Sequence, residues 1–152
     1  MPCTTHSLEP MTKLLFVCHG NICRSTMGEQ VARAWIDRDA LAIDVDSAGV
    51  SDEEHGNPID PRAARVLREH GYPTGSHRAQ QVTAAMIADA DLVLGFEPHH
   101  VQRMRHLAPG TDDIKLVTDF DPAAVPGSGI ADPWYGDRSS FEETLSAIEA
   151  AM

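Results

Sequence analysis

The 152-residue sequence contains no apolar run that approaches the roughly 20 residues needed to cross a bilayer as a helix. Basic side chains are scarce: 12 Lys and Arg stand against 23 Asp and Glu, for a formal net charge of -11. No cluster of Lys or Arg builds the positive surface that nucleic acid or an anionic membrane requires. We therefore expect no nucleic-acid partner and no membrane partner. A small anionic ligand stays compatible with this charge, because nearby dipoles and one or two cations set the field inside a site.

Cysteine is also scarce. The chain has three, an odd number, and two of them, Cys18 and Cys23, lie only five residues apart. This count and spacing argue against a disulfide framework and for a reducing compartment, in which cysteine is kept for its reactivity. We therefore expect a cytoplasmic protein.

The first twelve residues contain two prolines and no apolar stretch of the kind found in secretory signals. Residues 1–12 are interpreted as a flexible leader. Residues 13–152 have the length of one compact unit that can bury its own core, so we expect a single domain there. We expect this domain to be a monomer.

Hydrophobic patterning divides the chain into alternating strands and helices. Strands are predicted at residues 13–17, 43–47, 92–94 and 114–117. Helices are predicted after the first strand, between Asp60-Pro61 and Gly71, at residues 84–88 and 98–107, and after a capping-box pattern at Ser139. Strands that alternate with helices pair in parallel through right-handed crossovers. The predicted fold is therefore an α/β three-layer sandwich, a central four-stranded parallel sheet with helices on both faces.

In open parallel sheets ligands bind beyond the carboxyl ends of the strands, so the turn after the first strand, CHGNICRS at residues 18–25, is the candidate site. Gly20 and Asn21 tolerate a left-handed backbone, so this loop can turn its N–H groups inward around an anion. The helix that follows adds positive potential, and the planar guanidinium of Arg24 can grip two phosphate oxygens. The sequence therefore predicts a phosphate-binding loop after the first strand.

The same positive field acts on the thiol of Cys18. A cysteine that faces a helix N-terminus and a guanidinium has its pKa lowered from about 8.5 to between roughly 3.5 and 7.5, which makes it a thiolate at neutral pH. The hydroxyl of Ser25 can stabilise that thiolate with one hydrogen bond. We therefore predict Cys18 as the nucleophile and Arg24 as the phosphate clamp.

The loop matches the signature C-x-G-N-x-C-R-S, and the chain thereby resembles the low-molecular-weight protein tyrosine phosphatases. The similarity continues in SAG at residues 47–49, GNPIDPRA at residues 56–63, HRA at residues 77–79 and DPWYG at residues 132–136, where the family has D-P-Y-Y-G. In order and spacing it extends over nearly the whole chain from Lys13 onward.

This resemblance implies a protein tyrosine phosphatase that hydrolyses phosphotyrosine in proteins, and small aryl phosphates, through a phosphocysteine on Cys18. It places the general acid and base at Asp132, a role that composition leaves open among 23 acidic residues. It also implies that Ser47 and His77 hold Asn21 and so keep the loop in shape. Contacts with phosphate and substrate are expected from His19, Gly20, Asn21, Ile22, Cys23, Ser25, Trp134 and Tyr135. No metal and no other cofactor is expected.

Several alternatives stay open at these positions. Cys18, His19 and Cys23 could begin a zinc site, although no second cysteine pair completes the usual four ligands. Cys23 is either a plain core residue or the partner of Cys18 in a reversible disulfide. Arsenate reduction needs further downstream cysteines, and none follows Cys23. Relatives that act on phosphoarginine tend to carry Thr in place of Ile22, and a binder without activity should have lost Cys18 or Asp132.

Two positions depart from the family's usual residues in ways that bear on the substrate. Glu53 and Glu54 stand where relatives often carry Trp and His beside the substrate, so their charges are expected to weaken binding of acidic phosphopeptides. Glu97 stands where Asp is commoner.

Overall fold

A computed structural model describes residues 12–152, apart from the side chain of Tyr135. Four parallel strands form one sheet in the order β2-β1-β3-β4. They are β1 (Thr12–Cys18), β2 (Ile43–Gly49), β3 (Leu92–Gly95) and β4 (Ile114–Leu116). β1 is an inner strand because its apolar run can be covered on both faces. It begins at Thr12, one residue before its predicted start, and residues 1–11 of the expected leader lie outside the described residues.

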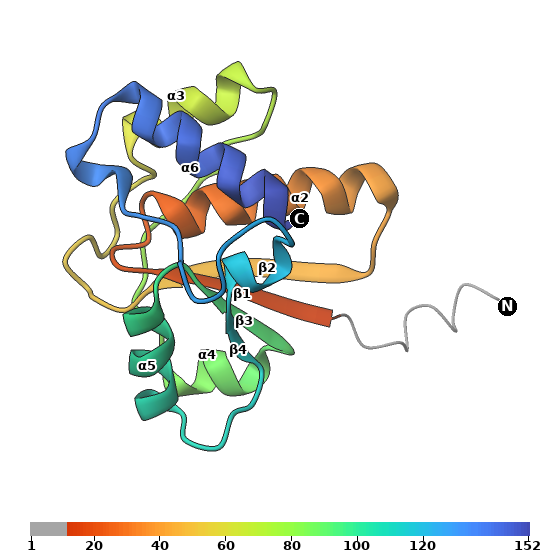
Figure 1. Cartoon of the computed structure of the whole chain (residues 1–152), viewed down its shortest axis with the longest axis vertical. Coiled ribbons are helices and arrows are strands. Elements are labelled where there is room, and N and C mark those ends of the chain that lie inside the picture. The colour runs from red at the N-terminus through yellow and green to blue at the C-terminus, as the bar shows by residue number, and fades with distance from the viewer. Residues whose placement is uncertain (1–11) are drawn as a thin grey trace, which may run out of the picture.

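Helices cover both faces of the sheet (Figure 1). One face carries α2 (Arg24–Asp39), α3 (Pro61–Glu69) and α6 (Arg138–Ala151), and the other carries α4 (Ala84–Asp89) and α5 (Pro98–Leu107). The segment between β4 and α6 contains two short 3-10 helices, η1 (Val117–Phe120) and η2 (Pro133–Tyr135). The architecture confirms the predicted three-layer α/β fold with a four-stranded parallel sheet.

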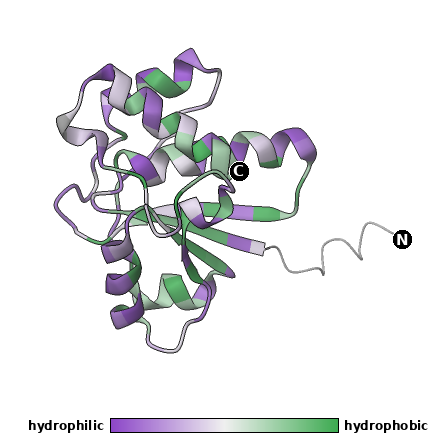
Figure 2. Ribbon diagram, viewed as in Figure 1, coloured by the Kyte–Doolittle hydropathy of each residue, from purple (hydrophilic) through white to green (hydrophobic). Residues whose placement is uncertain are grey.

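The side chains of β1 alternate between two cores, one on each face of the sheet. Phe16 packs on the α2 side with Met27 and Phe141, whereas Val17 packs on the opposite side with Met104. Figure 2 shows the hydrophobic colour concentrated on the strands and the hydrophilic colour on the outer turns of the helices. β1 is therefore fixed from both sides, and so is the loop that follows it. No helix within residues 12–152 is long and apolar enough to span a membrane.

Two helix starts test the predicted caps. At α3 the carboxylate of Asp60 accepts a hydrogen bond from the backbone N–H of Arg62 at 2.8 Å, as the cap prediction requires. The last helix differs, because the side chain of Asp137 accepts from the N–H of Ser139 at 3.0 Å. Asp137 is thus the cap, and the predicted capping box that opened at Ser139 was wrong. A carboxylate satisfies the free N–H groups here two residues earlier than the serine would.

Candidate active site

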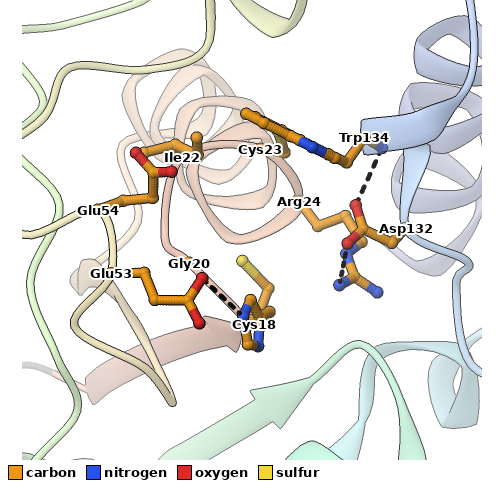
Figure 3. A pocket seen from close by; sticks show the side chains of 10 residues that line it. Cys18, Gly20, Ile22, Cys23, Arg24, Glu53, Glu54, Asp132 and Trp134 are labelled. Carbon is orange, nitrogen blue, oxygen red and sulfur yellow. Dashed lines mark hydrogen bonds and ion pairs between the residues drawn. The ribbon is translucent and has the colours of Figure 1, made fainter.

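The loop between β1 and α2 opens into a cavity of about 180 Å³ at the carboxyl end of the sheet (Figure 3). Cys18 is the last residue of β1 and Arg24 the first of α2, so the loop joins the two elements over five residues, 19–23. The cavity is lined by Cys18, His19, Gly20, Ile22, Cys23, Arg24, Glu53, Glu54, Asp132 and Trp134. The structure therefore brings most of the predicted site residues together, although Asp132 and Trp134 lie more than 100 positions from the loop in sequence.

Asn21 is the central support of this loop. Its backbone has a φ of 61°, in the left-handed region that Asn tolerates better than most residues, and its side chain is fully buried. Its amide nitrogen donates to the hydroxyls of Ser25 and Ser47, each at 2.9 Å, and its amide oxygen accepts from the backbone N–H of Gln80 at 3.0 Å. The side chain is thus held from three directions, which fixes the turn of the loop.

A line of hydrogen bonds runs from Glu29 on α2 to the thiol of Cys18. Ser47 donates its hydroxyl proton to the carboxylate of Glu29 at 2.5 Å and accepts from Asn21. Because Ser25 also accepts from Asn21, its own hydroxyl proton is free to point at the sulfur of Cys18, 3.1 Å away. The network therefore presents Ser25 to Cys18 as a hydrogen-bond donor.

His77 and Thr26 brace the backbone of the same loop. Nε2 of His77 contacts the carbonyl oxygen of Asn21, and the Thr26 hydroxyl donates to the same oxygen at 3.1 Å. The sequence had indicated Ser47 and His77 around Asn21, but not Glu29. Glu29 is buried on α2 and pairs with Arg33 at 2.7 Å.

The two described cysteines are both free, and they differ in their surroundings. The Cys18 side chain points into the cavity beside Ser25 (Figure 3). Burial, followed by the nearby carboxylate of Asp60, raises the pKa of the Cys23 thiol far above its usual range. Cys23 is therefore held as a neutral thiol in this structure.

Arg24 is 1% exposed, yet its guanidinium reaches the cavity. Nη1 donates to the carbonyl oxygen of Ile130 at 2.8 Å and lies 3.1 Å from a carboxylate oxygen of Glu97. Nη2 lies 3.6 Å from a carboxylate oxygen of Asp132, as Figure 3 shows. The buried guanidinium of Arg24 is thus oriented by Glu97 and Ile130 on one side, and it faces Asp132 on the other.

Asp132 enters the site from an exposed loop that precedes η2. Its carboxylate accepts from the backbone N–H of Trp134 at 3.0 Å, and its side chain is 38% exposed. Arg62 supports this loop from α3: its guanidinium lies 5.1 Å from the centre of the Trp134 ring and donates to the Trp134 carbonyl oxygen at 2.9 Å. Tyr135, predicted to contact substrate, has its side chain outside the described part of the structure.

The mouth of the cavity carries two carboxylates from the loop after β2. Glu53 lies 3.6 Å from Nε2 of His19, and Glu54 accepts from the side-chain amide of Asn57 at 2.7 Å. Both side chains line the cavity (Figure 3). A ligand that enters therefore passes negative charge before it reaches Arg24.

The zinc alternative finds no support in this geometry. Within residues 12–152, the side chains close enough together to share a metal ion are Glu97, His99 and His100. Cys18, His19 and Cys23 do not form such a group.

The fold and the loop define an α/β protein with a cysteine at the end of β1 and an arginine at the start of α2, on either side of one turn. The model of the family "Low molecular weight phosphotyrosine protein phosphatase" matches residues 13–152. The chain is 39% identical over 145 residues to a low molecular weight protein-tyrosine-phosphatase of Streptomyces coelicolor, covering 91% of this chain and 88% of the relative. It is 41% identical over 140 residues to low molecular weight protein-tyrosine phosphatase A of Mycobacterium tuberculosis, covering 90% and 85%.

A solved structure is similar over the same length. The Erwinia amylovora tyrosine phosphatase AmsI has a TM-score of 0.82 and 32% identity, and the match covers 95% of this chain and 90% of that one. The chain therefore belongs to the low-molecular-weight protein-tyrosine phosphatase family, whose members are cysteine-dependent hydrolases.

Proposed function

We propose that this protein hydrolyses phosphotyrosine in proteins, and small aryl phosphates, through a phosphocysteine formed on Cys18. Arg24 is the phosphate clamp and Asp132 the general acid and base. The observation that carries the proposal is the placement of all three around one cavity, with the Arg24 guanidinium 3.6 Å from the Asp132 carboxylate and the Cys18 sulfur within the same walls.

In the first step the Cys18 thiolate attacks phosphorus in line with the aryl oxygen. A sulfur–phosphorus bond forms and the phosphorus–oxygen bond to the ring breaks, while the loop N–H groups and Arg24 hold the other phosphate oxygens. The protonated carboxyl of Asp132 gives its proton to the leaving oxygen, so that a neutral phenol departs. The products are phosphocysteine and the Asp132 carboxylate.

In the second step that carboxylate takes a proton from water as the water oxygen attacks phosphorus. The sulfur–phosphorus bond breaks, inorganic phosphate forms, and Cys18 leaves as the thiolate. The Ser25 hydroxyl, 3.1 Å from the sulfur, stabilises this leaving group with a hydrogen bond. Asp132 ends the cycle protonated, as it began, so no metal ion is needed for proton transfer.

The walls of the cavity favour an aromatic ester. Trp134 provides an exposed aromatic face at the mouth, and Ile22 supplies apolar surface from the loop. An apolar residue at position 22 offers no hydrogen bond to the guanidinium of phosphoarginine, whereas it packs against a phenyl ring. We further propose that the protein acts as a monomer in the cytoplasm. The free thiols of the two described cysteines, Cys18 and Cys23, agree with a reducing compartment.

The test is hydrolysis of p-nitrophenyl phosphate and of a phosphotyrosine peptide in EDTA between pH 5 and 8. Cys18→Ser should lose activity by more than about 10⁴-fold, because a serine hydroxyl in this field is far less ionised than the thiol. Cys3→Ser, outside the described residues, is the matched control and should leave the rate unchanged. Full activity of Cys18→Ser, or loss of wild-type activity in EDTA, would refute the mechanism; faster release of phosphate from a phosphoarginine peptide would redirect the substrate assignment.

A further inference from the structure

A buried histidine lies behind the clamp. His100, in the first turn of α5, has no exposed surface. Its Nδ1 accepts hydrogen bonds from the backbone N–H groups of Phe96 and Glu97, at 3.3 and 3.1 Å. An imidazole nitrogen that accepts from two amides carries no proton, so the proton of the neutral ring lies on Nε2. The backbone therefore fixes the tautomer.

Nε2 of His100 lies 3.5 Å from a carboxylate oxygen of Glu97, and it has no hydrogen-bond partner among residues 12–152. Burial, and then the charge of Arg24, lower the pKa of His100 to about 3, so the ring stays neutral at working pH. A buried N–H without an acceptor is costly, and the carboxylate of Glu97 is the acceptor within reach.

The same carboxylate oxygen of Glu97 lies 3.1 Å from Nη1 of Arg24. It thus stands between a buried imidazole and the buried guanidinium, while the exposed His99 approaches it to 3.8 Å from the solvent side. Glu97 also caps α5, where its side chain accepts from the backbone N–H of His100. It has several rotatable bonds and is partly exposed, so the imidazole of His100 is a further contact that limits its orientations.

We propose that His100 is a positioning residue: its Nε2–H orients the Glu97 carboxylate, which in turn holds the Arg24 guanidinium ready for phosphate. The inference deepens the proposed function, on which it rests for the role of Arg24. It makes the strength of phosphate binding depend on a side chain that never touches the phosphate.

Glu97, His99 and His100 also have the spacing of a metal site, since their ligand atoms all lie within 4.8 Å of one another. The tautomer argues against that use. A metal ion needs the lone pair of Nε2, and moving the proton to Nδ1 would set it against two backbone N–H groups. In this tautomer Nε2 can only donate, and the Glu97 carboxylate 3.5 Å away is the acceptor that it faces.

Two substitutions separate the roles of the two ring nitrogens. His100→Asn places an amide oxygen near Nδ1, so it keeps an acceptor for the backbone N–H groups but loses the donor to Glu97. His100→Gln places its amide nitrogen near Nε2 and keeps that donor. His99→Gln is the matched control, because this exposed neighbour on α5 approaches the same oxygen of Glu97.

The measurement is calorimetric binding of inorganic phosphate to the whole chain, with circular dichroism to verify the fold and steady-state kinetics alongside. His100→Asn should weaken phosphate binding about tenfold, the effect of one hydrogen bond to a charged group, and raise KM more than it lowers kcat. His100→Gln should weaken binding less than about threefold, and His99→Gln should leave it unchanged. In a Glu97→Leu background, where position 97 offers no acceptor, His100→Asn should add nothing.

Wild-type affinity in His100→Asn, an equal loss in His99→Gln, or a full loss that persists in the Glu97→Leu background would each overturn the positioning role. If His100→Asn does not fold, His100→Gln becomes the test. Retained phosphate binding in His100→Gln then supports the positioning role, and loss of binding contradicts it. Phosphate binding is measured without turnover, so tight binding by an inactive wild type would refute the proposed function and leave this inference intact.

Discussion

The two sides of the candidate site are held in different ways. On the nucleophile side, Asn21, Arg24 and Ser25 are buried, and their side chains bond to groups that are themselves mostly buried. On the acid side, Asp132 is 38% exposed and Trp134 is 40% exposed, and the carboxylate bonds within its own loop. In the proposed mechanism the buried half binds phosphate and the exposed half transfers protons.

The energetic consequence follows from burial. Breaking a hydrogen bond around Asn21 leaves a buried polar atom without a partner, whereas breaking one around Asp132 lets water replace the lost contact. Changes on the nucleophile side should therefore affect stability and activity together. Changes on the acid side should affect activity with little cost in stability.

The largest expected effect comes from Arg24→Lys, which disrupts the buried contacts on the nucleophile side. An ammonium group cannot bond to Ile130, Glu97 and two phosphate oxygens with the fixed geometry of the planar fork, so kcat/KM should fall about 10³-fold. Hydrolysis of p-nitrophenyl phosphate and the melting temperature should both decrease. Arg103→Lys, on the exposed face of α5, is the control; wild-type kinetics in Arg24→Lys would contradict the clamp.

Asp132→Asn tests the acid side. The loss of rate should depend on how good a leaving group the substrate carries. Without the proton, hydrolysis of phenyl phosphate should slow about 10² to 10³-fold, because phenolate is a poor leaving group. Cleavage of the bond to p-nitrophenolate, a better leaving group, should slow much less. The melting temperature should stay within a few degrees. Equal losses on both substrates would count against Asp132 as the acid.

Asn21→Ala should cost about 2 to 4 kcal/mol of unfolding free energy, since it removes the buried hydrogen bonds to Ser25, Ser47 and Gln80. Activity should also fall, because the loop loses the group that holds its left-handed turn. Urea unfolding measures the first effect. Asn57→Ala, which removes an exposed asparagine, should cost less than about 0.5 kcal/mol; a similar small cost for Asn21→Ala would show that the network is not structural.

Arg62→Met removes the contacts that hold the acid loop while keeping most of the side-chain volume. We expect a several-fold loss of kcat, since Asp132 is then held only through its own loop, and a loss of roughly 1 kcal/mol from the partner lost by Asp60. Arg65→Met on the exposed side of α3 is the control. An unchanged kcat would mean that Arg62 supports the fold alone.

The smallest effect is expected at the mouth of the cavity. Replacing Glu53 and Glu54 by Gln should lower KM for a phosphotyrosine peptide with acidic neighbours by about two- to fivefold at low salt, with little change for p-nitrophenyl phosphate. The gain should shrink in 0.5 M salt, roughly as the Debye length shortens. A gain that does not depend on salt would argue for packing instead of charge.

Some features of the fold and the site could be predicted from local sequence pattern, whereas others depend on residues that are distant in the sequence. The loop at residues 18–25 is contiguous, so its Cys18 and Arg24 were recognisable from local pattern, and alternating strands and helices were sufficient for the fold. Glu29 and His100 could not be recognised in this way, because their buried contacts are with residues brought near by tertiary packing. A buried glutamate paired with Arg33 on the same helix looks in sequence like an ordinary surface ion pair.

The helix caps give a second example. Asp60 and Asp137 are both N-caps, but Asp60 is followed by a proline that marks the helix start, whereas Asp137 competes with two serines nearby. Local chemistry permits either start for the last helix. In the structure the Asp137 carboxylate is the cap and accepts from both the backbone N–H and the hydroxyl of Ser139.

The most direct test of the account is to trap the covalent intermediate. Asp132→Asn should form phosphocysteine from p-nitrophenyl phosphate, because this leaving group departs without an acid, and should hydrolyse it slowly, because the base is missing. Rapid denaturation followed by peptide mass spectrometry should then find one phosphoryl group on Cys18, and none in the Cys18→Ser, Asp132→Asn double variant. A phosphoryl group on another side chain, or none while nitrophenol is still released, would contradict the central claim.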